Sequence, residues 1–464
     1  MIVDCCDVGQ TQLTTDTLPD DALLYIFDFY VAPSLASEVE AWRTLVQVCR
    51  RWRILVYRSP RRLNLRIVCT DKTPAVKGKL DAWPAQPVVI SGTFNSTNIK
   101  AALEHHDRIC QIKLFQVDPN IIASLEKPFP ILTDLDLCAF TFSPPFNIDP
   151  SRFLGGSPHL RSLTLSGIWI PCLPKLLLST PNLVILRLDQ IRNSCLSDEM
   201  VAVLSSLTRL EMLDLEIEFD RPHPKLKHQF LPRLTCTVLP SLTMLKVTGN
   251  IESLEDFVAQ INAPLLDHLY IILFPFPPFD RTLVLDTPQL LLFIGRTPKL
   301  RVPVEAYTGF NADKIWINLF HSMRISHHVL KLEIFELEPK REIPCPAQFC
   351  RSLPFPHHPL EDLYICGGER RQRNLTEPSE HARLLELLQP FAAVKNLYVT
   401  KEFASHIAHA LQGLVEERVM EVLPTLKNVF IQEFELSGPV HRVIKEFVVA
   451  RQLAGHPITI SCWG

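Results

Sequence analysis

Cysteine and histidine are the residue types in this sequence best suited to metal chemistry. Their tightest grouping places Cys345, Cys350 and Cys366 within a short span that also holds His357 and His358. Adjacent histidines on a regular element face different ways, and none of the spacings repeats that of a zinc site. Prolines throughout this stretch indicate a loop. We therefore expect surface residues without a metal here.

The sequence also lacks the motifs that carry phosphate or acyl-transfer chemistry. Two pairs, Gly155-Gly156 and Gly367-Gly368, have neither the further glycine nor the lysine of a phosphate-binding loop. No Gly-x-Ser-x-Gly turn is present, and the scattered acidic residues nominate no acid–base pair. A hydrolase or transferase would need a convergent polar pocket, of which the sequence shows no sign. We predict a protein that is not an enzyme and binds no cofactor.

The composition favours many short, regularly punctuated elements. Leucine accounts for 69 of the 464 residues, beside 38 prolines and only 15 glycines. A net charge of −3 offers no bulk attraction to nucleic acid or to an anionic membrane. The 13 cysteines are too sparse for a disulfide scaffold. With no basic signal segment and no apolar run of about 18 residues, we expect the cytoplasm or the nucleus, and no nucleic-acid or membrane partner.

Residues 17–60 differ from the rest of the chain and predict three short helices, behind a disordered tail at residues 1–16. The run Leu18-Pro19-Asp20-Asp21 indicates a helix start, because proline is favoured in the first turn and carboxylates there complement the helix dipole. Apolar residues then recur at helical spacing in residues 23–30, 39–46 and 48–56. A unit this small buries little apolar surface alone and needs a partner or a neighbouring domain.

Two spaced blocks in this segment resemble the F-box motif. The first is Leu18-Pro19, Leu23 and Ile26-Phe27, and the second is Leu45, Val48-Cys49-Arg50-Arg51-Trp52 and Leu55-Val56. The residues that follow, Arg58–Leu65 and Leu80–Pro84, are similar to a segment found in a large group of F-box proteins of mushroom-forming fungi. The interval from Tyr30 to Trp42 is several residues longer than in a compact F-box.

The resemblance implies a role in a complex rather than a reaction. F-box modules dock their helices onto the Skp-type adaptor of a cullin–RING ubiquitin ligase, which is therefore the partner expected here. The matching positions would divide between that adaptor interface and the core of the module, and the sequence alone does not apportion them. They are Leu18, Pro19, Leu23, Ile26, Phe27, Leu45, Val48, Cys49 and Trp52.

Beyond residue 130, the pattern Leu-x-x-Leu-x-Leu recurs, often after a proline. Copies begin at Leu132, Leu160, Leu183, Leu210, Leu242, Leu266, Leu360, Val394 and Leu426, with degenerate copies at Leu300 and Val329. Leucines two residues apart share one face of a strand, so each copy predicts a strand with one apolar face. Helical stretches at residues 198–204, 251–258 and 382–388 separate the strands.

Strand, turn and helix at this period are the layout of a leucine-rich-repeat solenoid. We predict an α/β fold with a three-helix F-box at residues 17–60, divergent first repeats or a linker at 61–129, and an irregular leucine-rich-repeat array at 130–464. In the 61–129 segment, residues 88–90 and 111–115 favour strands and 99–105 a helix. The parallel strands would form a concave face, with the helices outside. A pair of ordinary α/β domains with leucine-rich strands is the alternative.

The residues between the strand leucines point to the opposite face, where a protein substrate would bind. Those of the first strands carry mixed charge: Asp136, Thr164, Arg187, Asp214 and Lys246. Those of the later strands place aromatic rings at equivalent positions: Tyr270, Tyr364, Tyr398 and Phe430. Such a row favours a contact surface, since aromatic residues are enriched at interface cores. Cover by a C-terminal helix or a neighbouring loop is the alternative.

Two functions fit these observations. The first is an F-box substrate-recognition adaptor of a cullin–RING ubiquitin ligase, whose repeats hold a protein substrate of unknown identity. The second is a leucine-rich-repeat interaction scaffold in which the F-box-like helices serve only as an N-terminal cap. A cap would bury Leu18, Ile26 and Phe27 against the first repeats, so the exposure of these residues discriminates between the two.

Overall fold

The computed structural model describes residues 18–31, 44–58, 65–69, 76, 78, 80, 87–93, 97–139, 153–155, 157–168, 173–192, 198–218, 236–274, 287–301, 305–310, 314–320, 329–335, 360–367, 378–414, 416–433 and 438–463. The chain divides into two compact units. Unit 1 is Met1–Leu137 with Arg152–His159, and unit 2 is Cys138–Ser151 with Leu160–Gly464.

Unit 1 joins helices to a short sheet of strand order β1-β2-β3-β4, in which β1, β2 and β3 run parallel. The first helix begins at Asp20, beside the start predicted at Leu18-Pro19, and the helix within the predicted 48–56 stretch begins at Arg50. A helical turn occupies residues 44–48, and most of the stretch 39–46 predicted as a helix lies outside the described residues. The elements are α1 (Asp20–Val31), α3 (Arg50–Arg58), β1 (Leu65–Cys69), β2 (Val88–Thr93), α5 (Thr97–Leu103), β3 (Ile109–Val117), α6 (Pro119–Ser124), β4 (Asp134–Ala139) and the 3₁₀ turn η1 (Phe153–Gly155).

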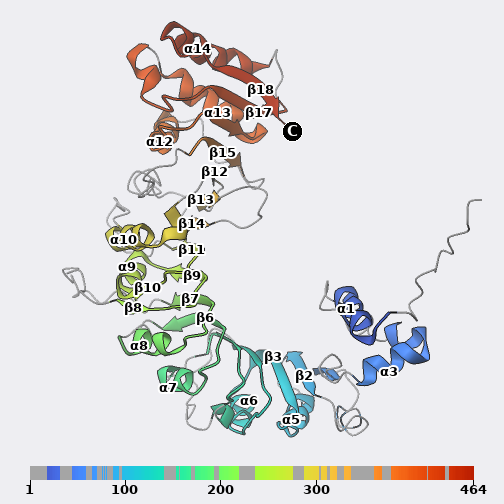
Figure 1. Ribbon diagram of the computed structural model, residues 1–464. Coiled ribbons are helices and arrows are strands. Elements are labelled where there is room, and N and C mark those ends of the chain that lie inside the picture. Colours follow the sequence, from blue (N-terminus) through green and yellow to red (C-terminus); the bar gives the residue numbers. More distant parts are fainter. Residues whose placement is uncertain are drawn as a thin grey trace, which may run out of the picture. The chain divides into compact units, whose positions relative to one another are not determined.

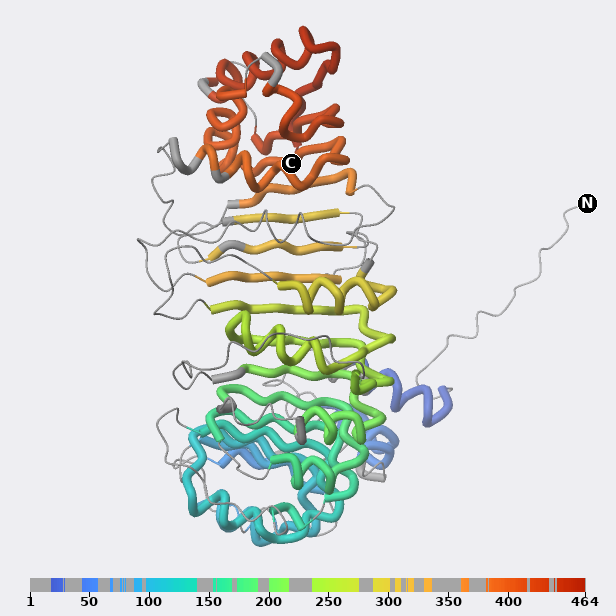
Figure 2. Tube along the Cα trace, turned by 90° about the vertical axis from the view of Figure 1, so that its left-hand side faces the viewer, coloured from blue at the N-terminus to red at the C-terminus, as the bar shows by residue number. Residues whose placement is uncertain are grey.

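Unit 2 is built around a long, mainly parallel sheet of order β5-β6-β7-β9-β11-β14-β13-β12-β15-β16-β17-β18 (Figure 2). Its strands are β5 (Ser162–Ser166), β6 (Ile185–Arg192), β7 (Met212–Glu218), β9 (Met244–Gly249), β11 (His268–Leu273), β12 (Glu305–Phe310), β13 (Lys314–Phe320), β14 (Leu330–Phe335), β15 (Asp362–Gly367), β16 (Asn396–Val399), β17 (Asn428–Gln432) and β18 (Thr459–Trp463). A separate parallel pair joins β8 (Thr237–Val238) to β10 (Ile261–Asn262).

The helices of unit 2 alternate with these strands along the chain, and α7, α8, α9 and α10 stack along one side of the sheet (Figure 1). Farther along, α13 packs against β15, β16 and β17, with α12 and α14 on either side of it. The helices are α7 (Leu173–Leu178), α8 (Asp198–Ser206), α9 (Ile251–Gln260), α10 (Pro288–Arg296), α12 (Pro378–Leu388), α13 (Lys401–Gln412) and α14 (Pro439–Leu453), with 3₁₀ turns η3 (Pro298–Arg301) and η4 (Glu416–Met420).

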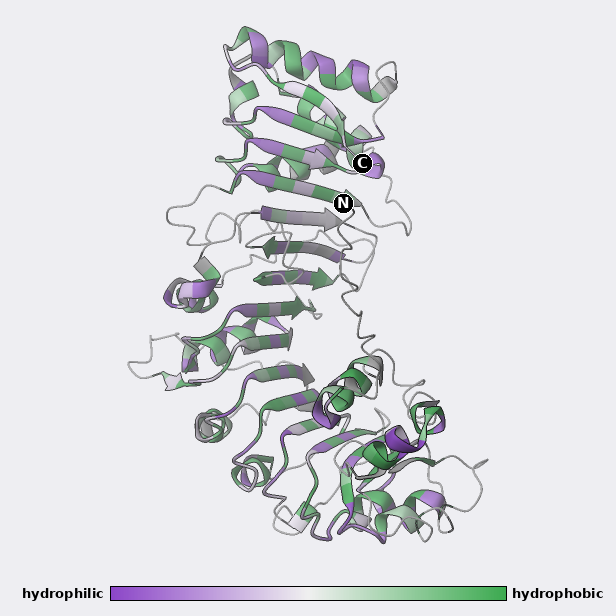
Figure 3. Ribbon diagram, turned by 45° about the vertical axis from the view of Figure 1, so that its right-hand side comes forward, coloured by the Kyte–Doolittle hydropathy of each residue, from purple (hydrophilic) through white to green (hydrophobic). Residues whose placement is uncertain are grey.

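The leucine pattern acts as predicted in most of these repeats. The first leucine of a copy closes a turn before its strand. The Leu183 amide donates to the Thr180 carbonyl (3.2 Å), and the Leu210 amide donates to the Leu207 carbonyl (3.0 Å). The next two leucines are buried on the helix side, and the residues between them lie on the other side. Hydrophilic and hydrophobic residues therefore alternate along the strands (Figure 3).

The strands β12, β13 and β14 depart from the predicted parallel array. Their spatial order is the reverse of their chain order, and β13 runs antiparallel to both neighbours. Residues 311–313 are too few for the crossover that a parallel pair requires, whereas an antiparallel pair needs only a short turn. Leu300 closes its turn as expected (3.2 Å to Thr297), but it lies within η3, and the next strand that the structure describes begins at Glu305. The prediction of uninterrupted parallel strands is wrong at this point.

Helices α9 and α10 are tied together by two side chains. The buried carboxylate of Glu255 accepts the backbone N–H groups of Gln289 and Leu290, both at 2.8 Å, in the first turn of α10. In return, Arg296 at the end of α10 donates to the carbonyls of Val258 (2.7 Å) and Ile261. The carboxylate therefore meets the positive end of the helix dipole and the guanidinium meets carbonyls at the end of its neighbour.

A Glu255→Gln variant is expected to lose about 1 kcal/mol of stability, because the amide accepts one of the two N–H bonds and carries no charge. Hydrogen exchange of the α10 amides measures the loss. Glu252→Gln is the matched control, because Glu252 lies exposed on the same helix and its neutralisation should change exchange little. Equal protection of α10 in both variants would contradict this role for Glu255.

Candidate functional site

The helical segment of unit 1 has a hydrophobic core made from its own residues. Leu23 and Phe27 of α1 meet Leu45, Leu55 and Val56, with Leu18, Leu24, Val46 and Trp52 packed around them. The rings of Phe27 and Trp52 lie 4.6 Å apart between centroids. Outside this core, the Arg51 guanidinium donates to the Leu18 carbonyl (2.6 Å) and pairs with Asp20 (2.7 Å), which joins α3 to the start of α1.

A second set of apolar side chains on these helices faces away from that core. Phe29 is 84% exposed and Ile26 49%, and Tyr25 is exposed beside them on the same face of α1. Val48 and Ile54 are exposed as well. We refer to Tyr25, Ile26, Phe29, Val48 and Ile54 as the exposed apolar set. Of the nine residues predicted from the motif, it contains Ile26 and Val48.

The remaining predicted positions divide as follows. Leu23, Phe27 and Leu45 are buried in the core, Leu18 and Trp52 pack against it, Cys49 is half-buried, and Pro19 is exposed at the start of α1. Sequence reasoning missed Tyr25, Phe29 and Ile54. Their signal was available in the spacing of Tyr25 and Phe29, which lie four residues apart and opposite Leu23 and Phe27 on a helix.

The face of the unit 2 sheet that lies opposite the helices carries one continuous row of side chains, set by strand register. From β5 to β18 the row is Thr164, Arg187, Asp214, Lys246, Tyr270, Lys331, Asn318, Tyr307, Tyr364, Tyr398, Phe430 and Ser461. The first half is charged, and its Lys246 and Asp214 pair at 3.1 Å. In unit 1, Asp136 pairs with Lys113 at 3.2 Å.

The second half of the row is an aromatic stack. Ring centroids lie 4.1 Å apart from Tyr307 to Tyr364, 4.2 Å from Tyr364 to Tyr398 and 4.7 Å from Tyr398 to Phe430, with neighbouring planes within 12° of parallel. These spacings are close to the distance between adjacent strands, so the rings stand upright on the sheet. We call these four residues the aromatic stack.

Two tryptophans border the aromatic stack. Trp463 of β18 meets Tyr398 edge to face at 5.8 Å and donates its indole N–H to the Val399 carbonyl (3.2 Å). Trp316 of β13 lies over Gly309 of β12, where a Cβ would approach Cζ2 of the indole to 2.1 Å. Only glycine leaves room for that ring. Neither tryptophan, nor Tyr307, stands in a Leu-x-Leu pattern, so the spacing of the leucines did not point to these three residues.

Tyr270 occupies the predicted row but does not belong to the stack, which corrects the expected grouping of four rings. Strands β14, β13 and β12 separate it from Tyr364, because the reversed meander is inserted there. Its ring lies between Lys331 (4.4 Å) and Lys246 (5.9 Å), and its hydroxyl donates to Glu333 (2.9 Å). Burial and this hydrogen bond raise the pKa of Tyr270.

Glu333 is the centre of a compact charged network. Its side chain is nearly buried, and one of its oxygens meets the ammonium groups of Lys314 (2.8 Å) and Lys331 (3.0 Å). Burial alone would raise the pKa of Glu333, but hydrogen bonds from Lys314, Lys331 and Tyr270 hold it below its ordinary value. The carboxylate is therefore ionised, and this part of the sheet carries excess positive charge.

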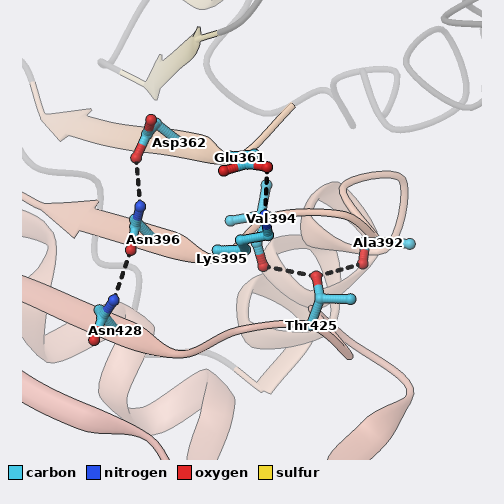
Figure 4. Close-up of polar contacts among 8 residues, drawn as sticks. All are labelled: Glu361, Asp362, Ala392, Val394, Lys395, Asn396, Thr425 and Asn428. Carbon is cyan, nitrogen blue, oxygen red and sulfur yellow. Dashed lines mark hydrogen bonds and ion pairs between the residues drawn. The ribbon is translucent and has the colours of Figure 1, made fainter. Parts of the chain in front are cut away.

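A polar row runs beside the aromatic stack, two residues earlier on each strand. Figure 4 shows its members Asp362, Asn396 and Asn428. Asn428 donates to Asn396 (2.8 Å), and Asn396 donates to the Asp362 carboxylate (2.8 Å). In register with Asp362 lies Glu305 of β12. Burial raises the pKa of Tyr364 to about 12, and the negative charges of Glu305 and Asp362 add to the shift. The aromatic stack is therefore flanked by anionic and amide groups.

The described part of the chain offers no group of three or more His, Cys, Asp or Glu side chains placed to hold a metal ion. Cys345, Cys350, His357 and His358 lie outside the described residues. Cys366 of β15 is half-buried, and burial raises the pKa of its thiol. Nor is any described helix both long enough and apolar enough to cross a membrane.

Comparison with known proteins gives a distant likeness among solved structures. No protein-family model matches the sequence, and no curated protein matches it. Among solved structures, the chain is similar to the leucine-rich repeat-containing protein LegL7 from Legionella pneumophila, at 11% identity and a TM-score of 0.28, covering 83% of this chain and 97% of that one. The mixed α/β architecture with a long, mainly parallel sheet, as predicted, rests on the strands and helices of this chain itself.

Proposed function

We propose that this chain is a substrate adaptor of a cullin–RING ubiquitin ligase. In this proposal the helices at residues 17–60 dock onto a Skp-type adaptor, and the repeats hold a protein substrate while other subunits transfer ubiquitin. The observation that carries it is the exposed apolar set, which lies outside the core formed by Leu23, Phe27, Leu45, Leu55 and Val56. An apolar helix face of this kind is stabilised when it enters a groove on a partner.

The alternative is an interaction scaffold whose helices only cap the repeats. A cap would bury Ile26, yet Ile26 is half exposed, and Phe27 is buried among the helices' own residues. These two positions favour docking over capping. The F-box assignment itself rests on the resemblance of the two sequence blocks.

The test is a binding measurement between the purified chain and the purified Skp-type adaptor of the same host. We expect an Ile26→Asp/Phe29→Asp variant to bind at least about tenfold more weakly, because charges would replace apolar side chains at the interface. Phe27→Asp is unsuitable, since Phe27 has no exposed surface and its charge would unfold the module.

Leu453→Asp is the matched control, because Leu453 on α14 is as exposed as Phe29 and lies far along the sequence in unit 2. Its binding to the adaptor should equal that of the parent. If the parent itself does not bind the adaptor, the ligase role is refuted and the capped scaffold is favoured.

A further inference from the structure

The aromatic stack lies in a region of the sheet face that carries negative charge. The face positions of β12, β15, β16, β17 and β18 that the structure describes contain two carboxylates, Glu305 and Asp362, and no lysine or arginine. At the borders of these strands, Lys395 pairs with Glu361 and Lys401 with Glu433, whereas Lys427 is exposed directly before β17. The described face positions of these five strands therefore carry net negative charge.

Aromatic rings and carboxylates together are the groups that bind a cationic side chain. The aliphatic stem of an arginine or lysine packs on aromatic carbon, and its charged head meets ring electrons and carboxylates. Arginine fits such a site better than lysine, because its planar guanidinium stacks on rings and pairs with carboxylates through two hydrogen bonds.

The part of the same row around Glu333 carries an excess positive charge and limits where such a side chain can lie. Lys246 is paired with Asp214, but Lys314 and Lys331 share the single carboxylate of Glu333 beside Tyr270. A cationic ligand is repelled from this part and attracted to the aromatic stack. Because the net charge of the side chains changes sign along the row, a basic segment is expected to bind at the aromatic stack.

We propose that the aromatic stack, with Glu305 and Asp362, binds a protein segment that carries arginine. This inference deepens the proposed function, since it names the chemistry of the substrate that the repeats would hold. Because the site lies entirely in unit 2, its test does not depend on the helical module.

The probes are fluorescein-labelled peptides of the sequence Gly-Arg repeated four times, with the arginines replaced by glutamate or by leucine in two further peptides. Titrated with the full chain, the arginine peptide should bind at least about tenfold more tightly than the other two. Binding should weaken as salt is added, because both partners are charged and exposed to solvent.

A Glu305→Gln/Asp362→Asn variant should bind the arginine peptide about tenfold more weakly. Both substitutions keep side-chain size, and near-ultraviolet circular dichroism checks that the rings remain stacked. Glu361→Gln/Glu433→Gln is the matched control, since it also removes two carboxylates, but ones that pair with lysines at the borders of the strands, outside the face positions. Binding should stay within about twofold of the parent.

If the leucine peptide binds as tightly as the arginine peptide, the proposal is wrong and the site is purely apolar. If the glutamate peptide binds more tightly than the arginine peptide, the site prefers an anionic segment and the proposal is wrong. Absence of arginine-peptide binding up to about 1 mM would refute it. If the adaptor fails to bind while the arginine peptide binds as expected, the ligase role falls and this site stands. If the adaptor binds while the arginine peptide does not, the ligase role stands and this site is refuted.

Discussion

An Arg451→Met variant is expected to lose about 3 kcal/mol of stability at the C-terminal end of unit 2. Arg451 is the largest fully buried side chain described, with 0% exposure. Its guanidinium donates to the carbonyls of Leu423 (2.9 Å), Pro424 (3.2 Å), Val419 (3.3 Å) and Leu426 (3.4 Å). Methionine fills a similar volume but donates nothing, so these carbonyls would lose their donor inside the protein.

The hydrogen bonds from Arg451 also stabilise an unfavourable backbone conformation at Leu423. Leu423 has a φ of 48°, in the left-handed region that residues with a side chain seldom adopt. Its carbonyl receives the shortest of the bonds to carbonyl oxygens from Arg451, so the guanidinium stabilises the turn that leads into β17. Burial lowers the pKa of Arg451, which reflects the cost of placing this charge away from water.

Hydrogen exchange of the β17 and α14 amides measures the effect, and we expect exchange about a hundredfold faster in Arg451→Met. Arg442→Met is the matched control, because Arg442 is exposed on the same helix. Arg451→Lys should be intermediate, since an ammonium lacks the fork that reaches several carbonyls. Unchanged protection in Arg451→Met would show that the turn does not depend on the guanidinium.

The second large effect is expected at Glu333. A Glu333→Gln variant should lose about 2 kcal/mol near neutral pH, because Lys314 and Lys331 would be left close together without the carboxylate that both contact. The loss stays moderate because both lysine side chains retain some exposure to water.

The same network predicts a pH dependence. The pKa of Glu333 is lower in the folded protein than its ordinary value, so its ionised form stabilises the fold above the unfolded pKa of about 4.3. That stabilisation is lost as the pH falls from there through the folded pKa. The free energy of unfolding of the parent, measured with urea, should therefore fall below about pH 5. The same quantity should fall less steeply with pH in Glu333→Gln.

Glu361→Gln is the control for both measurements. Glu361 also pairs with a lysine, but both side chains of that pair are about 40% exposed, so its neutralisation should cost little. A pH profile of Glu333→Gln as steep as that of the parent would show that other carboxylates govern acid sensitivity.

Much of unit 2 could be predicted because one period in the sequence specifies one structural unit. The copies at Leu183, Leu210 and Leu266 each place a turn, a strand and a buried face at the predicted residues. The reversed meander could not be predicted in the same way. Its inward residues in β12 are Ala306 and Thr308, so the leucine signal is absent. Strand order there depends on connection length and on neighbouring strands rather than on local pattern.

At the candidate sites, the sequence indicated which residue types would be present but not which of them would be exposed or stacked. Ile26 and Phe27 are adjacent apolar residues of the same motif, yet Phe27 is buried and Ile26 is exposed, because neighbours on a helix point about 100° apart. Tyr270 and Tyr364 hold equivalent positions in their own strands, and only the order of the strands between them excludes Tyr270 from the aromatic stack.

The amino-acid sequence by itself determined the helical module, the repeats and the alternation that places leucine on one face of each strand. These follow from local spacing, since side-chain direction repeats every two residues in a strand and every 3.6 in a helix. Only the tertiary structure decided which apolar residues remain exposed, which rings stack, and where the sign of charge changes along the row. These depend on register between strands distant in sequence, which no single segment encodes.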